Sequence, residues 1–489
     1  MHYDAGREVD VRRERAKFVN KFHGGCVTPR AAQRLAAAPM SATGSWRLWL
    51  GFVACLAVVR GVLLAGLIPR LNGPDEPAHF DYVQRLAEDF RLPVPKSVCA
   101  GYSLENRFLT ATLNEPIKFR PERPMPPLSA FVPPDPDQPS SRATTGCGPA
   151  STYPPLYYAT AAAAYRLEQH APYLQRLFAA RLASVGWGIV TACFAFLLGI
   201  AWSGRVRDGA LLGVIIAAQP MIAHLSAVVN NDAAMIAWAT GAFAAVALMA
   251  REVGSRRAFV LLVISTMAGA LSKPLFAFIL PILGLAVAVA LGPRRIGSWL
   301  RSAAALAPAA LIFLLWSIHV RTTGNLPSTT TPQPYAEIAA WALAPERLYV
   351  IWHKTFWMCW GWLDTWIDDG YYWALALTVS LAVAGFAAAW RRLDARDHTV
   401  AWLALAGSLS MVFALNGLEL VLMRKTGSAL IQGRYLLPLF PLQALGLVIG
   451  LRALSQRLGA WMDGSWAFAA LLLLIDAASV ARALVRYYA

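Results

Sequence analysis

Charged residues are scarce in this sequence. They make up 15% of the 489 residues, whereas a soluble protein of ordinary composition carries about 25%. Hydrophobic residues make up 57%, and the mean hydropathy is +0.46. Apolar runs recur from Trp46 onward, many of them close to the ~17–25 residues that cross a bilayer. These proportions exclude a soluble globular protein and predict an all-α polytopic membrane protein.

Acidic residues are the scarcer kind of charge, with 28 Asp and Glu against 44 Lys and Arg and a net charge of +16. A protein that binds nucleic acid would gather such an excess in a basic stripe interleaved with aromatic residues. Here the basic residues fall in short loops between apolar runs, as the positive-inside rule predicts. The charge therefore indicates topology, and we expect membrane lipid and no nucleic acid as a partner.

Cysteine is also rare, with six residues and no spacing typical of a zinc site. Cys99 and Cys147 fall in one predicted external loop, where two alternatives stay open. They form a disulfide in an oxidising compartment, or they remain two unpaired thiols.

Loop charges predict a topology of about eleven spans with the N-terminus inside, because this arrangement puts every basic loop on one side. The predicted spans are residues 46–70, 179–202, 208–228, 233–250, 257–272, 274–291, 299–320, 372–390, 399–417, 435–452 and 465–484. The matching location is a bacterial inner membrane, with the acid-rich loops facing the periplasm.

The segments outside these spans are predicted to be a cytoplasmic tail and two long periplasmic segments. Residues 1–45 are basic and without periodicity, which predicts a disordered cytoplasmic tail ahead of the transmembrane domain, 46–489. Residues 72–178 are expected to form a large periplasmic loop with interfacial helices, and 321–371 a second periplasmic segment.

A short apolar stretch, residues 154–168, is interpreted as an interfacial helix, because counting it as a span would invert every later loop. Its tyrosines, Tyr157, Tyr158 and Tyr165, would then act as anchors at the lipid headgroups.

Ionisable residues crowd into NGPDEPAHFDYVQ, residues 72–84, directly after the first span. Asp75, Glu76, His79 and Asp81 could simply cap the next helix, since carboxylates are favourable at a helix N-terminus. The functional alternative gains weight because other unusual groups reach the same predicted side. These are Asn231 and Asp232 in VVNNDAAM, Lys273 in LSKPLF and Arg434 in IQGRYLLP.

Each of these groups alone reads as a cap or a snorkelling cation. Four separate turns each carry a carboxylate or a cation at a membrane boundary. Capping and snorkelling do not account well for all four, because such charges are costly unless they are paired or functional. We therefore predict that acids and cations from distant turns meet in one site.

The ordered set of motifs resembles the glycosyltransferase C (GT-C) superfamily. GPDEPAHFDY is similar to the acidic motif after its first span, TYPPLYY (152–158) to an element before its second, and LSAVVNNDAA to its second acidic turn. LSKPLF and QGRYLLP resemble its Lys hairpin and late Arg motif. The closest likeness is to bacterial predicted membrane proteins related to aminoarabinose and protein-mannosyl transferases, over about residues 46–452.

This resemblance implies transfer of a sugar from a polyprenyl-phosphate donor to a hydroxyl of a lipid, glycan or protein acceptor. Such an inverting transfer needs a base near the hydroxyl and positive charge near the departing phosphate. Asp75 is the expected general base, and Glu76 would orient it or the acceptor. Arg434 and Lys273 are expected to bind the donor phosphate.

Other residues are expected to bind substrate, and a divalent cation (Mg²⁺ or Mn²⁺) held by Asp75 and Asp232 is a further possibility, with no other cofactor. The expected substrate-binding residues are His79, Tyr153, Tyr157, Asn231, Asp232 and His353. Tyr153 departs from the family pattern, since relatives often have His or Lys there. His353 lies in an aromatic segment, 341–373, that forms either an interfacial belt or a wall for the sugar or lipid.

Two other functions share the same substrates. A flippase of lipid-linked sugars would carry ionisable residues near the bilayer midplane, where only Asp476 is expected. A polymerase or ligase of surface polysaccharide would share the chemistry but not this order of motifs.

Overall fold

The computed structural model describes residues 45–94, 102–126, 139–146, 148–252, 254–323, 335–426, 431–460 and 463–489. The chain divides into two compact units, Met1–Leu48 and Trp49–Ala489, and the second contains all of the described helices apart from the first turn of the one that begins at Ser45. The described residues are helical apart from loops and one isolated bridge between Trp360 and Thr365. The predicted disordered tail and the cysteines Cys99 and Cys147 lie outside the described residues, Ser45 excepted.

Nine stretches of the described residues are long and apolar enough to cross a membrane, which confirms an all-α polytopic membrane protein. They are α3 (Ser45–Leu67), α7 (Tyr173–Ser203), α10 (Asp232–Arg251), η5 with α12 (Pro274–Ile279 and Leu280–Leu291), α13 (Ile296–Thr323), α17 with η7 (Asp369–Ala389 and Trp390–Arg392), α18 (Ala395–Thr426), η8 with α19 (Gly433–Leu439 and Phe440–Arg457) and α20 (Gly464–Tyr488).

The two other predicted spans are shorter than expected. Residues 208–228 form α8 (Val206–Ala218) and α9 (Pro220–Leu225), which meet at an extended Gln219 because a residue before proline avoids the helical conformation. Residues 257–272 form α11 (Arg256–Ala270), whose 15 residues reach only about 22 Å. The count of eleven therefore remains a prediction.

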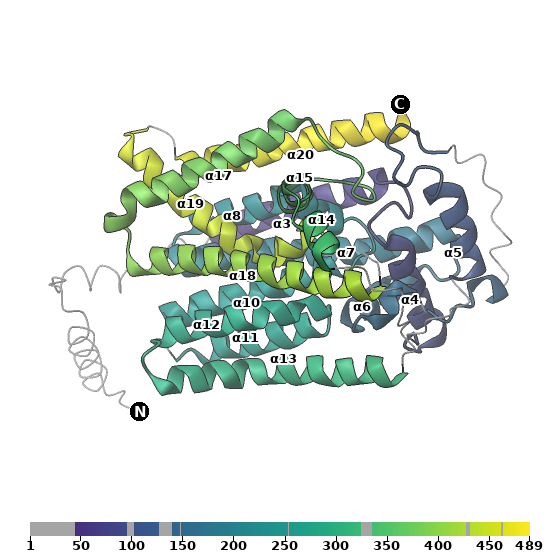
Figure 1. Ribbon diagram of the computed structural model, residues 1–489, viewed down its shortest axis with the longest axis horizontal. Coiled ribbons are helices and arrows are strands. Elements are labelled where there is room, and N and C mark those ends of the chain that lie inside the picture. The colour runs from purple at the N-terminus through teal and green to yellow at the C-terminus, as the bar shows by residue number, and fades with distance from the viewer. Residues whose placement is uncertain are drawn as a thin grey trace. The chain divides into compact units, whose positions relative to one another are not determined.

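Short helices gather at one end of the long ones, where Figure 1 shows α4, α5 and α6 together. These are α4 (Glu76–Asp89), α5 (Leu104–Leu109), η1 (Thr110–Asn114), η3 (Pro139–Arg142), η4 (Pro149–Thr152) and α6 (Leu156–Leu167). The segment before α17 adds α14 (Tyr335–Ala342), α15 (Pro345–Tyr349), η6 (Val350–Lys354) and α16 (Thr355–Trp357).

Helix α6 corrects one prediction. Tyr157, Tyr158 and Tyr165 are fully buried, because α6 packs between α4 and α7. The Tyr157 hydroxyl shares a hydrogen bond of 2.7 Å with Ser184 of α7, and Tyr165 donates to Glu88 of α4. The interpretation of these tyrosines as headgroup anchors is wrong, since their side chains pack against α4 and α7 of the protein.

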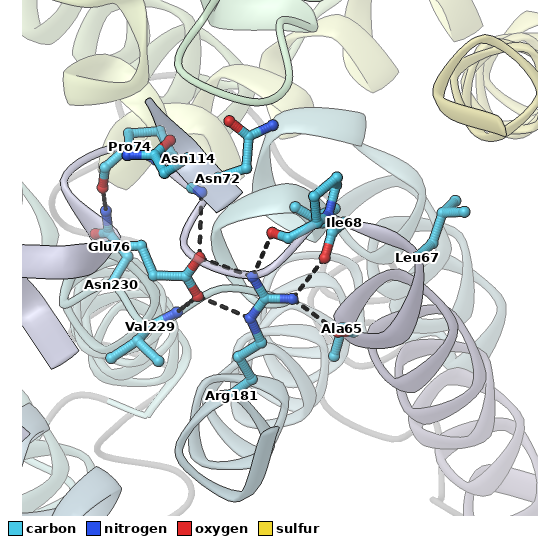
Figure 2. A network of polar contacts seen from close by, with 12 residues as sticks. Ala65, Leu67, Ile68, Asn72, Pro74, Glu76, Asn114, Arg181, Val229 and Asn230 are labelled. Atoms are coloured by element: carbon cyan, nitrogen blue, oxygen red, sulfur yellow. Dashed lines mark hydrogen bonds and ion pairs between the residues drawn. The ribbon is translucent and has the colours of Figure 1, made fainter. Parts of the chain in front are cut away.

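A buried ion pair, Arg181 with Glu76, fixes the turn between α3 and α4 (Figure 2). Arg181 Nε and Nη2 each donate to a Glu76 oxygen at 2.7 Å. The remaining N–H groups of Arg181 donate to the carbonyls of Ala65, Ile68 and Pro69 at 2.7–2.9 Å. All five donors of the guanidinium are thus used, and α7 holds the end of α3 and the start of α4 together.

The Glu76 carboxylate also binds the turn that leads into α10. Glu76 accepts from the backbone N–H of Val229 at 3.0 Å, and Asn230 donates to the Pro74 carbonyl at 3.0 Å (Figure 2). Gly73 permits this approach, because a Cβ there would lie 2.7 Å from the Val228 side chain. The turn that carries Asp75 is therefore joined to the turn that leads into α10.

We predict that Arg181→Gln lowers the free energy of unfolding by roughly 3–5 kcal/mol, because it leaves the Glu76 carboxylate buried without its countercharge. Thermal unfolding of the purified protein in detergent measures the loss. Arg205→Gln is the matched control, since Arg205 is exposed and its change should stay within about 0.5 kcal/mol. Equal stability of the two variants would contradict the role given to the pair.

Candidate active site

Asp75 projects from the turn before α4 in a left-handed conformation, with φ 59° and ψ 14°. A non-glycine residue held in this region costs about 1–3 kcal/mol, and it persists where its neighbours are fixed. Pro77 in the first turn of α4 and the buried Glu76 supply that constraint. The Asp75 side chain is consequently presented to the outside, with 46% of it exposed.

Arg434 comes from the far end of the sequence to meet Asp75. Its Nη2 lies 3.0 Å from Asp75 Oδ2 and its Nε lies 3.5 Å from Asp232 Oδ2, while only 2% of its side chain is exposed. Gly433 sets this position: its N–H donates to Thr355 Oγ1 at 2.7 Å, and a Cβ would lie 2.2 Å from the Ile351 carbonyl oxygen. Glycine is thus required where η8 begins.

Lys273 completes the group from the turn between α11 and η5. Its Nζ lies 2.6 Å from Asp232 Oδ1, and both residues are buried. Asp75, Asp232, Lys273 and Arg434 together form what we call the ion cluster, with two carboxylates and two cations. The predicted convergence of these four residues is therefore present, with Asp75 as the exposed member.

Several polar atoms of the ion cluster have no hydrogen-bond partner among the described residues. They are Nε and Nη1 of Arg434 and Oδ2 of Asp232, joined by Oδ1 of the neighbouring Asn231. Buried polar groups are hydrogen-bonded in about nine cases out of ten, so each exception calls for an explanation. An unpartnered guanidinium N–H beside an exposed carboxylate is suited to an anionic ligand.

Charge and burial act in opposite directions on the ionisable groups of the site. Burial raises the pKa of Asp75, but the charge and hydrogen bond of Arg434, with the charge of Lys273, outweigh burial and hold that pKa below its usual range. Burial lowers the pKa of Lys273, and it lowers the pKa of His79 to about 3. Asp75 is therefore ionised at neutral pH, and His79 is neutral.

The other residues predicted near Asp75 occupy different positions. Glu76 faces Arg181 with both oxygens engaged, so it can act on Asp75 through the backbone. His79 shares a 2.7 Å hydrogen bond with the hydroxyl of Tyr158 and stacks on Tyr153. Tyr153 borders the ion cluster, with its ring centroid 5.5 Å from Lys273 Nζ.

Three further predictions concern residues held mainly by the protein itself. Asn231 donates to the Ser272 carbonyl at 3.1 Å, next to Lys273. The Tyr157 hydroxyl is bound to Ser184 of α7. His353 binds the Tyr372 carbonyl at 3.0 Å and lines a separate cavity.

That cavity has a volume of about 530 Å³ and lies between η6, α16, α17, α18 and α19. Its walls are apolar and aromatic, including Trp352, Phe356 and Trp357, so the aromatic segment supplies a wall. Leu436 also lines it, two residues after Arg434. The cavity therefore reaches η8, the helix that carries Arg434.

A divalent cation between Asp75 and Asp232 stays a prediction, and in this arrangement both carboxylates are paired with cations of the chain. The Arg434 guanidinium lies between the two carboxylates, and Lys273 occupies the other oxygen of Asp232. The described residues also contain no group of three His, Cys, Asp or Glu side chains arranged to hold a metal. Two cations of the chain itself stand where the predicted ion would bind.

Sequence reasoning missed Arg181 and the aromatic neighbours Tyr158 and Tyr435. Arg181 sits inside a long apolar run, where an arginine reads as a snorkelling side chain. The ring of Tyr435 lies 5.1 Å from Lys273 Nζ and 5.5 Å from Arg434 Cζ. The position of Tyr435 directly after Arg434 in the sequence could have indicated that it lies beside the ion cluster.

Comparison with solved structures gives matches of low sequence identity. The chain is similar to ArnT from Cupriavidus metallidurans in the apo state, with 18% identity and a TM-score of 0.46 over 89% of this chain and 64% of that one. It is similar to the S. cerevisiae protein O-mannosyltransferase Pmt1-Pmt2 complex bound to the sugar donor, with 13% identity and a TM-score of 0.38 over 61% and 40%.

A third match is the Archaeoglobus fulgidus oligosaccharyltransferase, with 12% identity and a TM-score of 0.46 over 89% of this chain and 53% of that one. The chain thus spans less than two thirds of the length of these proteins. No curated protein matches the sequence.

A family model gives a match over most of the chain. It is described as a predicted membrane protein, DUF2142, and it covers residues 58–443, a range that contains all four members of the ion cluster. The predicted likeness to a family of predicted membrane proteins is confirmed. The chain belongs to the DUF2142 family of predicted membrane proteins.

Proposed function

We propose that this protein is a glycosyltransferase that moves a sugar from a polyprenyl-phosphate donor to an acceptor hydroxyl at the periplasmic face. The observation that carries the proposal is the buried Arg434, which has unpartnered N–H groups and lies 3.0 Å from a half-exposed carboxylate. A phosphate on Arg434 would place the donor next to Asp75.

The reaction moves one charge across the ion cluster. Asp75 takes the proton of the acceptor hydroxyl while that oxygen forms a bond to the anomeric carbon. The bond from this carbon to the phosphate oxygen breaks, and the polyprenyl phosphate gains a second negative charge. Negative charge passes from Asp75 to the phosphate, and Arg434 lies where it can stabilise either one.

Arg434 also links donor binding to the basicity of Asp75. Paired with Arg434, Asp75 is a weak base, because the guanidinium holds its pKa below the usual range. A donor phosphate that draws the guanidinium to itself weakens this pairing and makes Asp75 more basic. Lys273 supports the arrangement by neutralising Asp232 at 2.6 Å.

The apolar cavity beside η8 offers room for the polyprenyl tail. Its lining follows α17 from Val379 to Ala387 and ends at Trp390 of η7, a length of about 16 Å at the rise of an α-helix. The cavity reaches Leu436, close in sequence to Arg434, so a lipid there could place its phosphate at the ion cluster. His353 would then contact the lipid rather than the sugar.

The sugar and the acceptor would approach over the exposed face of Asp75. Tyr153 and the neutral His79 lie beside it and can stack on or hydrogen-bond a sugar ring. Asn231 has an unpartnered side-chain oxygen near Lys273 and is a further candidate for a sugar hydroxyl.

The flippase alternative loses its main support. Asp476, the one acid expected deep in the bilayer, accepts from Arg60 Nε at 2.7 Å and joins α3 to α20. A buried ion pair of this kind stabilises the packing of two spans. A polymerase or ligase of surface polysaccharide shares the donor chemistry and is the remaining alternative.

We predict that Asp75→Asn lowers transfer by about 10²–10⁴-fold, because the acceptor hydroxyl loses its base. The measurement is the composition of surface glycans in a bacterial strain that carries only the variant. A glycan that lacks one sugar is the expected result. Asp89→Asn, which removes a partly exposed acid at the other end of α4, should leave the glycans unchanged.

An unchanged glycan in the Asp75→Asn strain would contradict the proposal. Accumulation of an intact lipid-linked sugar, without loss of a transfer step, would favour the flippase.

We predict that Arg434→Gln weakens donor binding and moves the acid limb of the pH–rate profile to higher pH. Removing the guanidinium takes away the main cause that lowers the pKa of Asp75, so burial then raises that pKa. A base with a higher pKa is protonated, and lost to catalysis, at a higher pH. The pH dependence of kcat/KM for the donor measures both effects.

Arg321→Gln is the control, because Arg321 is exposed at the end of α13 that is predicted to be periplasmic. An acid limb that stays in place after Arg434→Gln would show that Asp75 is not the titrating base.

A further inference from the structure

A second cavity lies at the other end of α10 from the ion cluster. Helix α10 connects the two: Asp232 begins it in the ion cluster, and Arg251 ends it at the wall of this cavity. Its 20 residues span about 30 Å, which is the thickness of the hydrocarbon core. The second cavity therefore belongs to the other leaflet, which the basic loops predict to be cytoplasmic.

The interior of this cavity is apolar. Its volume is about 280 Å³, and its walls come from α7, α10, α12, α18 and α19. The lining includes Leu198, Phe243, Val289 and Leu445. Such walls suit a hydrocarbon chain and exclude a free phosphate or a nucleotide as the main occupant.

Two arginines stand at the rim of the cavity. Arg251 and Arg396 line it from α10 and α18, and both are exposed. Neither forms an ion pair with any residue in the part of the chain that the structure describes. The Arg251 side chain makes a long hydrogen bond of 3.4 Å to the Ile200 carbonyl.

Two of the three nearby acids are engaged elsewhere. Asp394 accepts from the backbone N–H groups of Arg396 and Asp397 at 2.9 Å, where it caps the start of α18. Asp397 accepts from the indole of Trp202 at 3.1 Å. Glu252 follows Arg251 and is exposed. The two guanidinium groups at the rim are thus available to an anion.

We propose that this cavity binds an acyl chain of an anionic phospholipid from the opposite leaflet, with Arg251 and Arg396 on its headgroup phosphate. Basic groups at a cytoplasmic lipid surface attract anionic lipids in this way. Trp202 also lines the cavity, and indole side chains are enriched at the level of lipid headgroups. The site is independent of the proposed glycosyl transfer.

Native mass spectrometry of the detergent-purified protein tests the proposal with phosphatidylglycerol and phosphatidylcholine of equal chain length. The wild type should retain phosphatidylglycerol on the order of tenfold more than phosphatidylcholine, since two basic groups contact the headgroup. Arg251→Gln with Arg396→Gln should bring the ratio close to one.

Arg256→Gln with Arg257→Gln is the matched control, because it removes two exposed charges from a neighbouring basic segment that does not line the cavity. It should keep the preference. Ala290→Phe fills the cavity and should reduce binding of both lipids while leaving the rim charges in place. Thermal unfolding confirms that each variant is folded.

The proposal is overturned if the Arg251/Arg396 variant keeps the preference, or if the Arg256/Arg257 control loses it equally. Undiminished lipid binding by a folded Ala290→Phe protein would also overturn it. Each of these readings is independent of any transferase activity.

Discussion

A guanidinium with all five N–H groups bound lies at the centre of this structure. Arg181 holds the Glu76 carboxylate and three carbonyls from the end of α3, and Glu76 in turn binds the Val229 N–H before α10. Removing either charge would leave the other stranded in an apolar interior. Through this pair, two turns separated by 153 residues of sequence keep one fixed relation.

The ion cluster depends on that relation. Asp75 and Asp232 lie on the two turns, and Arg434 contacts both because Gly433 lets η8 approach α16 closely. The group contains two negative and two positive charges, so its members stabilise one another without a bound ion. A ligand phosphate would compete with carboxylates for the same guanidinium, which makes the site responsive to an anionic donor.

The sequence predicted which residues form the ion cluster, but it did not predict the buried pair of Glu76 and Arg181 that holds the cluster in place. Asp75, Asp232, Lys273 and Arg434 each stand next to an apolar run, and counting the runs puts them on one side. Glu76 and Arg181 could not be paired in this way, because their contact depends on how α7 packs against α3. Packing of α6 between α4 and α7 likewise buries the tyrosines of α6, whose composition suggested a lipid interface.

One departure from the predicted spans, the break between α8 and α9, depends on a tertiary contact. The break at Gln219 is stabilised by its own side chain, which accepts from Ile222 N–H and donates to the Phe356 carbonyl. An apolar run with one proline does not reveal such a partner 137 residues away. Element type was therefore readable from local sequence, whereas length and burial were decided by tertiary contacts.

An experimental structure of the protein with a bound polyprenyl phosphate would decide whether Arg434 receives the donor. We expect the phosphate within hydrogen-bond distance of the Arg434 guanidinium, the isoprenoid chain in the cavity beside η8, and a longer distance from Arg434 to Asp75. A phosphate bound away from Arg434, with the pairing to Asp75 intact, would contradict this assignment.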